Sequence, residues 1–285
     1  MNAPVRLTPV VQIADWLHPR ASKWKALAML EAYFDESWTQ PQHQGVTAIA
    51  GYVASRDVWA SIEASWTDQL GLYANKGLRT FHAADCCGNT GYGEFALVDT
   101  FHRMSILTNL SGLLEKSDVQ PIWSAVYTED WNAVVADKAF IAKFAHPFHL
   151  CFEHIVRQLA GWAKRKANGE RVAPMFARQR QYEGWMTLAG EAYGQFEWYQ
   201  KALGPIAFGY PCQVVPLQAA DLLAHEISWE WDRLGYSVPT SLAEAGVRHL
   251  LAKATAFNGM HEGGCFDASA LTGAVERFNR TGQVI

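Results

Sequence analysis

The sequence predicts a single α/β domain built on a mixed β-sheet. Two largely apolar segments near the N-terminus, residues 27–34 and 45–54, are typical of buried strands, and the polar, proline-containing stretch between them suits a hairpin connection. Strand-like and helix-like segments then alternate along the chain. No internal repeat or low-complexity linker interrupts this alternation, which favours one continuous domain.

The first expected helix begins after Ser55, a residue type favoured at helix N-caps, and carries Asp57 in its first turn. Its apolar side chains recur at spacings of three and four residues, as in an amphipathic helix: Trp59, Ile62, Trp66, Leu70 and Tyr73. After a loop with the sequence FHAADCCGNTGYG, the pattern predicts strands over 119–127, 171–177 and 205–210 and helices over 97–114, 129–143, 147–167, 182–199 and 217–233. We therefore expect a core domain over residues 25–235, an N-terminal arm over 1–24 and a peripheral C-terminal extension of the same domain over 236–285.

The composition is that of an ordinary globular protein. Hydrophobic residues make up 49% of the chain and charged residues 18%, which excludes a disordered or fibrous class. The longest largely apolar run, residues 46–54, is less than half the ~20 residues that a membrane-spanning helix requires. Because no secretory signal is recognisable and the five cysteines suit free thiols, we expect a cytoplasmic protein without a membrane partner.

Charge is distributed unevenly along the chain. The net charge is −4, yet residues 157–180 hold seven basic residues and one acid. Such segregation is expected of a surface that faces the phosphates of a nucleic acid, and equally of a solvated helix end and loop.

The stretch YFDES at residues 33–37 ends an apolar segment with two carboxylates, Asp35 and Glu36. Strand ends in α/β sheets are common places for a site, although the same residues could simply begin a polar turn. Alternation along a strand predicts that Glu36 points away from Asp35.

The segment PLQAADLLAHEISWEWDR at residues 216–233 predicts a helix with one polar stripe. The stripe has spacings of three and four residues: Gln218, Asp221, His225, Ser228 and Asp232. Small alanines beside Asp221 allow close approach of this helix to the sheet, so we expect Asp221 to face the strand ends. For Ser228 and Asp232 an ordinary solvent-exposed face is favoured.

The motif FHAAD places His82 and Asp85 three residues apart. His82 suits a general acid or base, or a residue that orients substrate, and a structural histidine is the competing interpretation. The adjacent Cys86 and Cys87 lack the two-residue gap of usual zinc sites, so we do not expect a structural zinc site. No P-loop, dinucleotide-binding glycine motif or GxSxG nucleophile motif is present.

Taken in order, YFDES, AIAGYVAS, FHAAD and PLQAADLLAHEI resemble the bacterial and phage domain-of-unknown-function 3800 family, over roughly residues 28–233. The resemblance implies a ribonuclease H-like fold, a mixed sheet flanked by helices with a carboxylate cluster that holds Mg²⁺ or Mn²⁺. Asp35 would be the acid of the first strand and Asp221 the acid of the closing helix. Two ions about 4 Å apart could then activate water and stabilise the leaving oxygen of a phosphodiester.

Two residues depart from the family pattern. Trp38 stands where relatives commonly have a glycine, and Ala177 stands where relatives often have an acid at a strand end. Either Glu183 or Asp85 substitutes for the missing carboxylate, or catalysis in this chain is weakened or absent.

The first functional hypothesis is a divalent-metal-dependent nuclease acting on DNA or RNA. Asp35 and Asp221 would bind metal, Glu36 or Asp85 would assist, and His82 would orient or protonate the leaving group. Gln218 would hydrogen-bond backbone or substrate, and Arg178 and Arg180 would bind substrate. The alternatives are a non-catalytic nucleotide- or nucleic-acid-binding regulatory protein on the same fold, favoured by Ala177, and an interaction protein that forms homo-oligomers through some of its 12 tryptophans.

Overall fold

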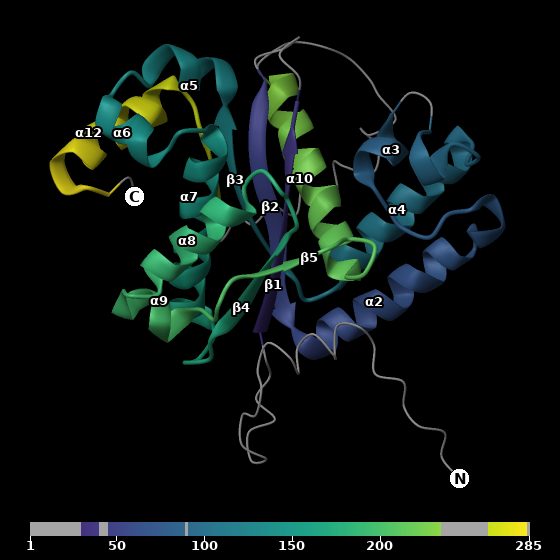
Figure 1. Ribbon diagram of the computed structural model, residues 1–285. Coiled ribbons are helices and arrows are strands. Elements are labelled where there is room, and N and C mark those ends of the chain that lie inside the picture. The colour runs from purple at the N-terminus through teal and green to yellow at the C-terminus, as the bar shows by residue number, and fades with distance from the viewer. Residues whose placement is uncertain (1–29, 40–44, 89–90, 235–261, 284–285) are drawn as a thin grey trace.

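A six-stranded mixed sheet runs through the centre of the molecule (Figure 1). The structure, a computed structural model, describes residues 30–39, 45–88, 91–234 and 262–283. The strands are β1 (Leu30–Trp38), β2 (Val46–Ser55), β3 (Gln120–Tyr127), β4 (Val172–Ala177), β5 (Ala207–Gly209) and β6 (Glu262–Phe266). Their order in the sheet is β5-β4-β1-β2-β3-β6, with β1–β2 and β2–β3 antiparallel and the other neighbours parallel. The predicted α/β class with a mixed sheet is confirmed.

Strand β1 lies between β2 and β4. It pairs with β4 from Leu30 to Phe34 and with β2 along its whole length, so that Asp35 lies opposite Ala50. Gly51 of β2 is needed for this pairing, because a Cβ atom there would lie 1.8 Å from the carbonyl oxygen of Tyr33. The end of β1 is therefore held at a defined place in the sheet.

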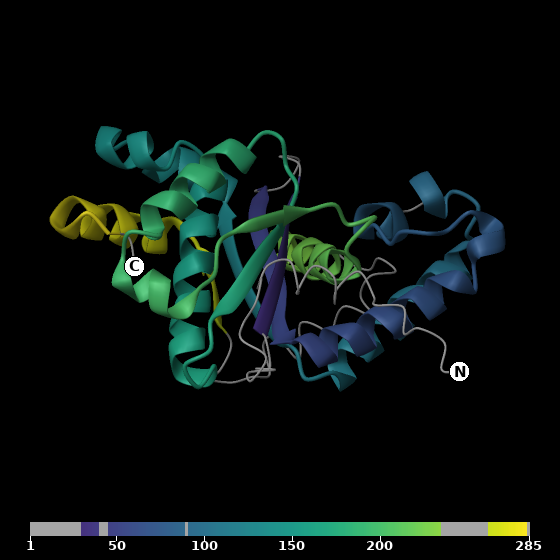
Figure 2. The same cartoon turned by 60° about the horizontal axis from the view of Figure 1, so that its bottom comes forward.

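Helices cover both faces of the sheet (Figures 1 and 2). One face carries α2 (Arg56–Gly71), α3 (Ala83–Cys87), α4 (Thr100–Lys116) and α10 (Val215–Leu234). The other carries α5 (Thr128–Val134), α6 (Lys138–Lys143), α7 (Pro147–Lys166), α8 (Glu183–Tyr193), α9 (Glu197–Ala202) and α12 (Ala268–Thr281). Helix α10 packs directly on β1 and β2, and α7 packs on β2 and β3.

Each face of the sheet has its own apolar core. In β1, Tyr33 belongs to the core beneath α10, whereas Ala32 and Phe34 belong to the core beneath α7. Burial on both faces explains why the strands read as nearly continuous apolar runs. Among the tryptophans whose side chains the structure describes, only Trp38 and Trp229 are exposed, so most of the aromatic content is core or partly buried material.

Two long helices expected from the sequence are each divided. The helix predicted over 129–143 is α5 followed by α6, and that predicted over 182–199 is α8 followed by α9. The first break is caused by Asp137, whose side chain accepts a hydrogen bond from the Phe140 amide and so begins a new helix. The loop around FHAAD contains the short helix α3 and a 3₁₀ turn at Gly93–Phe95, and a further 3₁₀ turn lies at Ala74–Lys76.

The expected C-terminal extension contributes to the sheet. Strand β6 pairs in parallel with residues 122–126 of β3, and α12 packs on α5 and α6. The expected N-terminal arm, 1–24, and residues 236–261 of the extension lie outside the described residues. None of the helices described is long and apolar enough to cross a membrane.

Candidate functional site

Asp35 lies within β1, just past the point where β1 stops pairing with β4, on the face that packs against α10. The sequence predicted that the strand ends before Asp35, but pairing with β2 continues to Trp38. The Asp35 side chain is only 8% exposed, and Oδ1 accepts a hydrogen bond at 2.8 Å from the backbone amide of Glu36. Burial raises the pKa of Asp35 well above its usual range, and the negative charges of Glu36 and Asp221 raise it further. Asp35 is thus a buried acid with like charges around it.

Asp221 approaches Asp35 from α10. The fully buried Ala220 and Ala224 let α10 lie close to the sheet, as the sequence indicated. Asp221 is 7% exposed, and its Oδ2 accepts a hydrogen bond of 2.7 Å from the backbone amide of Ala83. Burial raises the pKa of Asp221 to about 6. The two aspartates, 186 positions apart in the sequence, are therefore electrostatic neighbours in the fold.

Glu36 follows Asp35 along β1, and its charge and those of the two aspartates act on one another. Burial raises its pKa to about 7; the charge of Asp221 raises it too, whereas a side-chain hydrogen bond with Asp35 lowers it. The charge of Glu36 also acts on Tyr182, which belongs to the core on the α7 face of the sheet. That Glu36 points to the face opposite Asp35, as strand alternation predicts, stays a prediction.

Residues 81–87 are attached to one stripe of α10. Gln218 accepts hydrogen bonds from the Phe81 amide at 2.9 Å and from Trp66 Nε1 at 3.0 Å, and it donates to the Pro211 carbonyl at 2.8 Å. One turn further along the helix, Asp221 binds the Ala83 amide, as described above. Gln218 is 2% exposed, so its contacts are with the protein's own backbone and Trp66. This favours the backbone-binding role over direct contact with a substrate.

His82 and Asp85 lie at the beginning of α3, beside Asp221. The distance from His82 Nδ1 to Asp85 Oδ2 is 3.2 Å, and the His82 side chain is 57% exposed. The positive charge of protonated His82 lowers the pKa of Asp221, whereas the charge of Asp85 raises it. The fold thus brings five predicted site residues into one electrostatic neighbourhood, with the imidazole on the solvent side.

Ala177 occupies the position at which a third acid would join Asp35. The parallel pairing of β1 with β4 aligns Phe34 with Phe176, so the next residues in register are Asp35 and Ala177. Ala177 also belongs to the core on the α10 face, the face that Asp35 shares. Neighbouring strands lie about 4.8 Å apart, so an acid at residue 177 would stand beside Asp35.

The basic segment 157–180 does not form one patch. Arg157, Lys164 and their neighbours lie on α7, before β4, whereas Arg178 and Arg180 follow β4, about 20 Å along the strand. Because β1 and β4 are parallel, Arg178 and Arg180 lie toward the same end of the sheet as Asp35. Arg178 forms an ion pair of 3.1 Å with Glu183 and lies over the Tyr210 ring, and Arg180 is exposed.

Ser228 and Asp232, expected on a solvent-exposed face, are 0% and 4% exposed. Ser228 Oγ lies 2.9 Å from Ser37 Oγ, at the end of β1, and also donates to the His225 carbonyl. Helix α10 packs on β1 and β2 and also contacts α2 and α3, so its polar stripe meets protein rather than water. The solvent-face prediction is wrong for both residues.

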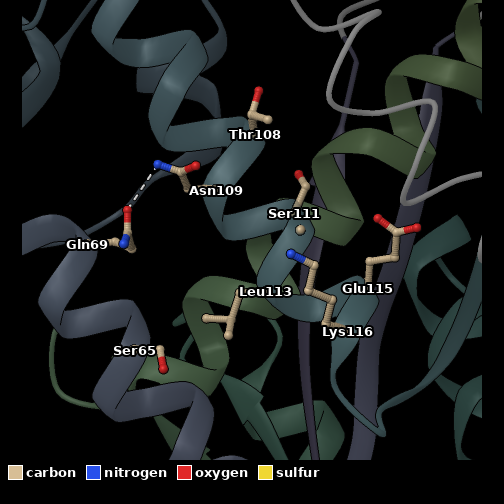
Figure 3. Close-up of a pocket in the computed structure, with 9 residues that line it drawn as sticks. Ser65, Gln69, Thr108, Asn109, Ser111, Leu113, Glu115 and Lys116 are labelled. Carbon is tan, nitrogen blue, oxygen red and sulfur yellow. Dashed lines mark hydrogen bonds between the residues drawn. The ribbon is translucent and has the colours of Figure 1, made fainter.

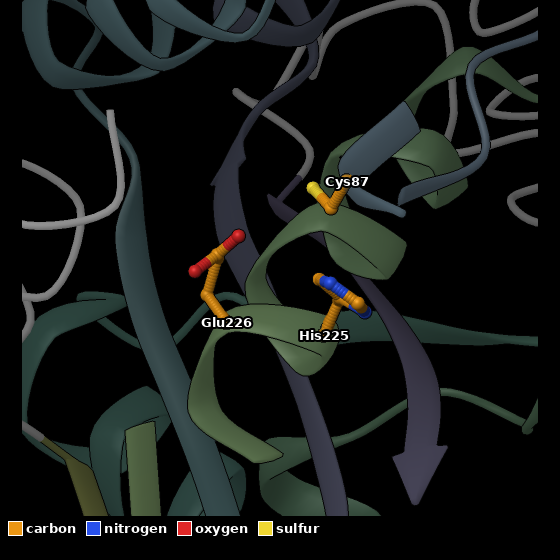
Figure 4. Close-up of side chains that lie close together, drawn as sticks. All are labelled: Cys87, His225 and Glu226. Atoms are coloured by element: carbon orange, nitrogen blue, oxygen red, sulfur yellow. The ribbon is translucent and has the colours of Figure 1, made fainter. Parts of the chain in front are cut away.

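A second group of potential ligands lies next to the acids, and the sequence did not reveal it. Cys87, His225 and Glu226 have ligand atoms that all lie within 4.8 Å of one another (Figure 4). Among the residues that the structure describes, no other trio of His, Cys, Asp or Glu side chains meets this condition, Asp35, Glu36 and Asp221 included. The one available signal was the spacing of His225, four residues after Asp221 on the polar stripe.

Two pockets lie away from these acids. One, of about 510 Å³, lies between α2 and α4, where Gln69 accepts a hydrogen bond from Asn109 (Figure 3). The other, of about 540 Å³, lies between the C-terminal end of α7 and α9, and Arg157 and Trp198 are among its lining residues. No predicted site residue lines either pocket.

Comparisons of the chain with protein-family models, with curated proteins and with solved structures found no match.

Proposed function

We propose that this protein is a divalent-metal-dependent phosphodiesterase that acts on DNA or RNA, built on a ribonuclease H-like fold. One observation carries the proposal: Asp35 in the central strand and Asp221 in α10, 186 positions apart in the sequence, are both buried, and the charge of Asp221 acts on Asp35. A polar turn would leave Asp35 in water, where no like-charged partner would be assembled around it.

The architecture supports the fold assignment. The sheet is mixed and flanked by helices on both faces, the first strand is central, and its acid Asp35 faces a late helix that carries the second acid. This is the arrangement that the family resemblance implies for Asp35 and Asp221.

The donor set fits a hard divalent cation. Carboxylate oxygens suit Mg²⁺ and Mn²⁺, and Mg²⁺ is commonly held by one or two carboxylates together with water and substrate phosphate. Asp35 and Asp221 would hold the ion, with Glu36 in support. Burial is the main cause of their raised pKa values, and the charges of neighbouring acids add to it; a bound cation would favour the ionised carboxylates. When bound, the ion would supply a more acidic water molecule and neutralise phosphate charge.

Protein groups around the acids would position the substrate. His82 is exposed and held by Asp85, so it can orient the phosphodiester or protonate the leaving oxygen. Arg180 is exposed just after the C-terminal end of β4 and can contact a phosphate. Arg178 already forms an ion pair with Glu183.

The missing third acid gives a direct test. Labelled single- and double-stranded DNA and RNA are incubated with the purified full chain and Mn²⁺, alongside Ala177→Asp, Ala177→Asn and Asp35→Asn. We expect slow cleavage by the natural chain, faster cleavage by Ala177→Asp, and no gain with Ala177→Asn, which has the same size without the charge. Loss of cleavage in Asp35→Asn would tie the activity to this site. The proposal fails if neither the natural chain nor Ala177→Asp cleaves any substrate.

A second candidate function is nucleic-acid binding without cleavage, and Ala177 favours it. Ala177 leaves the β4 position beside Asp35 without a carboxylate, which suits a protein that retains the fold and has lost the reaction. Affinity for a nucleic acid that falls with increasing salt, persists in Asp35→Asn and is accompanied by no turnover would select this function.

A further inference from the structure

Cys87, His225 and Glu226 combine three kinds of donor atom that are used together for one class of metal. Thiolate sulfur, imidazole nitrogen and carboxylate oxygen are the ligands of zinc, whereas Mg²⁺ and Mn²⁺ prefer oxygen alone. His225 and Glu226 are 7% and 1% exposed, and Cys87 is partly buried. The trio joins the last residue of α3 to the middle of α10 (Figure 4).

We propose that Cys87, His225 and Glu226 form a binding site for a transition-metal ion of the zinc class, separate from the carboxylate site of Asp35 and Asp221. The inference does not rest on the proposed nuclease function, since it uses none of the residues expected to bind Mg²⁺ or Mn²⁺.

The geometry requires only a small adjustment. The ligand atoms lie within 4.8 Å of one another, whereas tetrahedral zinc places its ligand atoms roughly 3.5 Å apart. Side-chain rotation that closes each distance by about 1 Å would complete three bonds and leave a fourth position for water. The Cys87 thiol shares hydrogen bonds with Cys86 and with His225; the first, with burial, raises its pKa, and the second lowers it. Binding would convert the thiol to a thiolate and release its proton to solvent.

A buried polar group of β2 lies within reach of the charge of Glu226. The Tyr52 hydroxyl of β2 is buried and has no hydrogen-bond partner among the residues described. The negative charge of Glu226 acts on this hydroxyl. A buried donor of this kind is costly unless something occupies the space beside it, and water or hydroxide on a metal bound by Glu226 would accept its hydrogen bond.

A metal bound here would fix α3 to α10. Helix α3 begins beside His82 and carries Asp85, whereas α10 carries Asp221, one helical turn before His225. The ion would therefore hold the FHAAD segment against the helix that supplies the second acid, and its binding to the folded state alone would raise the free energy of unfolding.

Cobalt(II) provides the test, because a thiolate ligand gives it a charge-transfer absorption that an oxygen-only site does not. The full chain in a thiol-free reductant is titrated with Co²⁺, together with Cys87→Ser, Glu226→Gln, the matched control Cys212→Ser, and Asp35→Asn. Cys212 is exposed and lies outside the trio. We expect a one-equivalent charge-transfer band that Cys87→Ser abolishes, that Glu226→Gln weakens at least tenfold in affinity, and that Cys212→Ser and Asp35→Asn retain.

A second measurement uses only the natural chain. Zinc should protect Cys87 from alkylation, as followed by peptide mass spectrometry, and leave Cys212 fully reactive. Absence of the cobalt band, its persistence in a folded Cys87→Ser variant, or equal alkylation of Cys87 with and without zinc would each overturn the proposal. Cleavage activity enters none of these readouts, so failure of the nuclease proposal would be recognised separately.

Discussion

Replacing Glu36 by glutamine should make the metal-free protein more stable at alkaline pH. Burial, and to a smaller extent the charge of Asp221, raise the pKa of Glu36 from 4.5 to about 7. The folded chain therefore holds a proton on Glu36 between these two pH values, where the unfolded chain has released it. This contribution to stability is fully present below pH 4.5 and is lost as the pH rises through 7.

The size of the effect follows from the difference between the two pKa values. A change from 4.5 to about 7 corresponds to a cost of roughly 3.5 kcal/mol above pH 7, at about 1.4 kcal/mol per pKa unit. Glutamine remains neutral at every pH and can still donate a hydrogen bond to Asp35, as a protonated glutamate does. Because the three acids influence one another, roughly 3.5 kcal/mol is the upper limit of the gain.

The assay is chemical denaturation in EDTA at about pH 4.5 and pH 8, with exposed Glu191→Gln as the matched control. We expect Glu36→Gln to exceed the natural chain by about 2–3 kcal/mol at the higher pH and by less than about 0.5 kcal/mol at the lower. Mn²⁺ should reduce the advantage by stabilising the natural acids. An advantage that is the same at both pH values, or is matched by Glu191→Gln, would refute the reasoning.

Three further substitutions test the framework that positions the site. Gly51→Ala should cost about 3 kcal/mol or more, because its Cβ atom would lie 1.8 Å from the Tyr33 carbonyl oxygen; urea denaturation showing normal stability would contradict the strand pairing. Trp66→Phe removes the hydrogen bond to Gln218 Oε1 and should cost about 1–2 kcal/mol, so a loss of under about 0.5 kcal/mol would show that this bond contributes little. Phe140→Ala empties a fully buried position and should cost about 3–5 kcal/mol in thermal or urea unfolding; a neutral result would mean that α6 is not packed as described.

Local pattern was sufficient for much of the fold and for the main acids. The apolar run over 27–34 predicted β1, although the strand continues past Asp35 to Trp38, and the three-and-four spacing of Gln218, Asp221 and His225 predicted one helix stripe. Both predictions depend on periodicity within a single element, which sequence expresses directly. The small residues beside Asp221 also indicated correctly that α10 lies close to the sheet.

What sequence could not supply are relations between elements. Ser228 looked solvent-exposed because its partner, Ser37, lies 191 positions away on another element. Local cysteine spacing did not reveal that Cys87 lies close to His225 and Glu226, because these two residues come from a distant helix. The strand that contains Asp35 extends to Trp38 because β2 continues to pair with it, which the polar residues after Phe34 did not indicate.

The attachment of residues 81–87 to α10 makes the site sensitive to helix register. Gln218, Asp221 and His225 follow one another at intervals of about one helical turn. They contact Phe81, Ala83 and Cys87 respectively. Inserting or deleting one residue in α10 before Gln218 would rotate the whole row by about 100° and break every contact together. Single side chains of this row can therefore be substituted one at a time. A one-residue change in the length of the helix before Gln218 would instead break all three contacts at once.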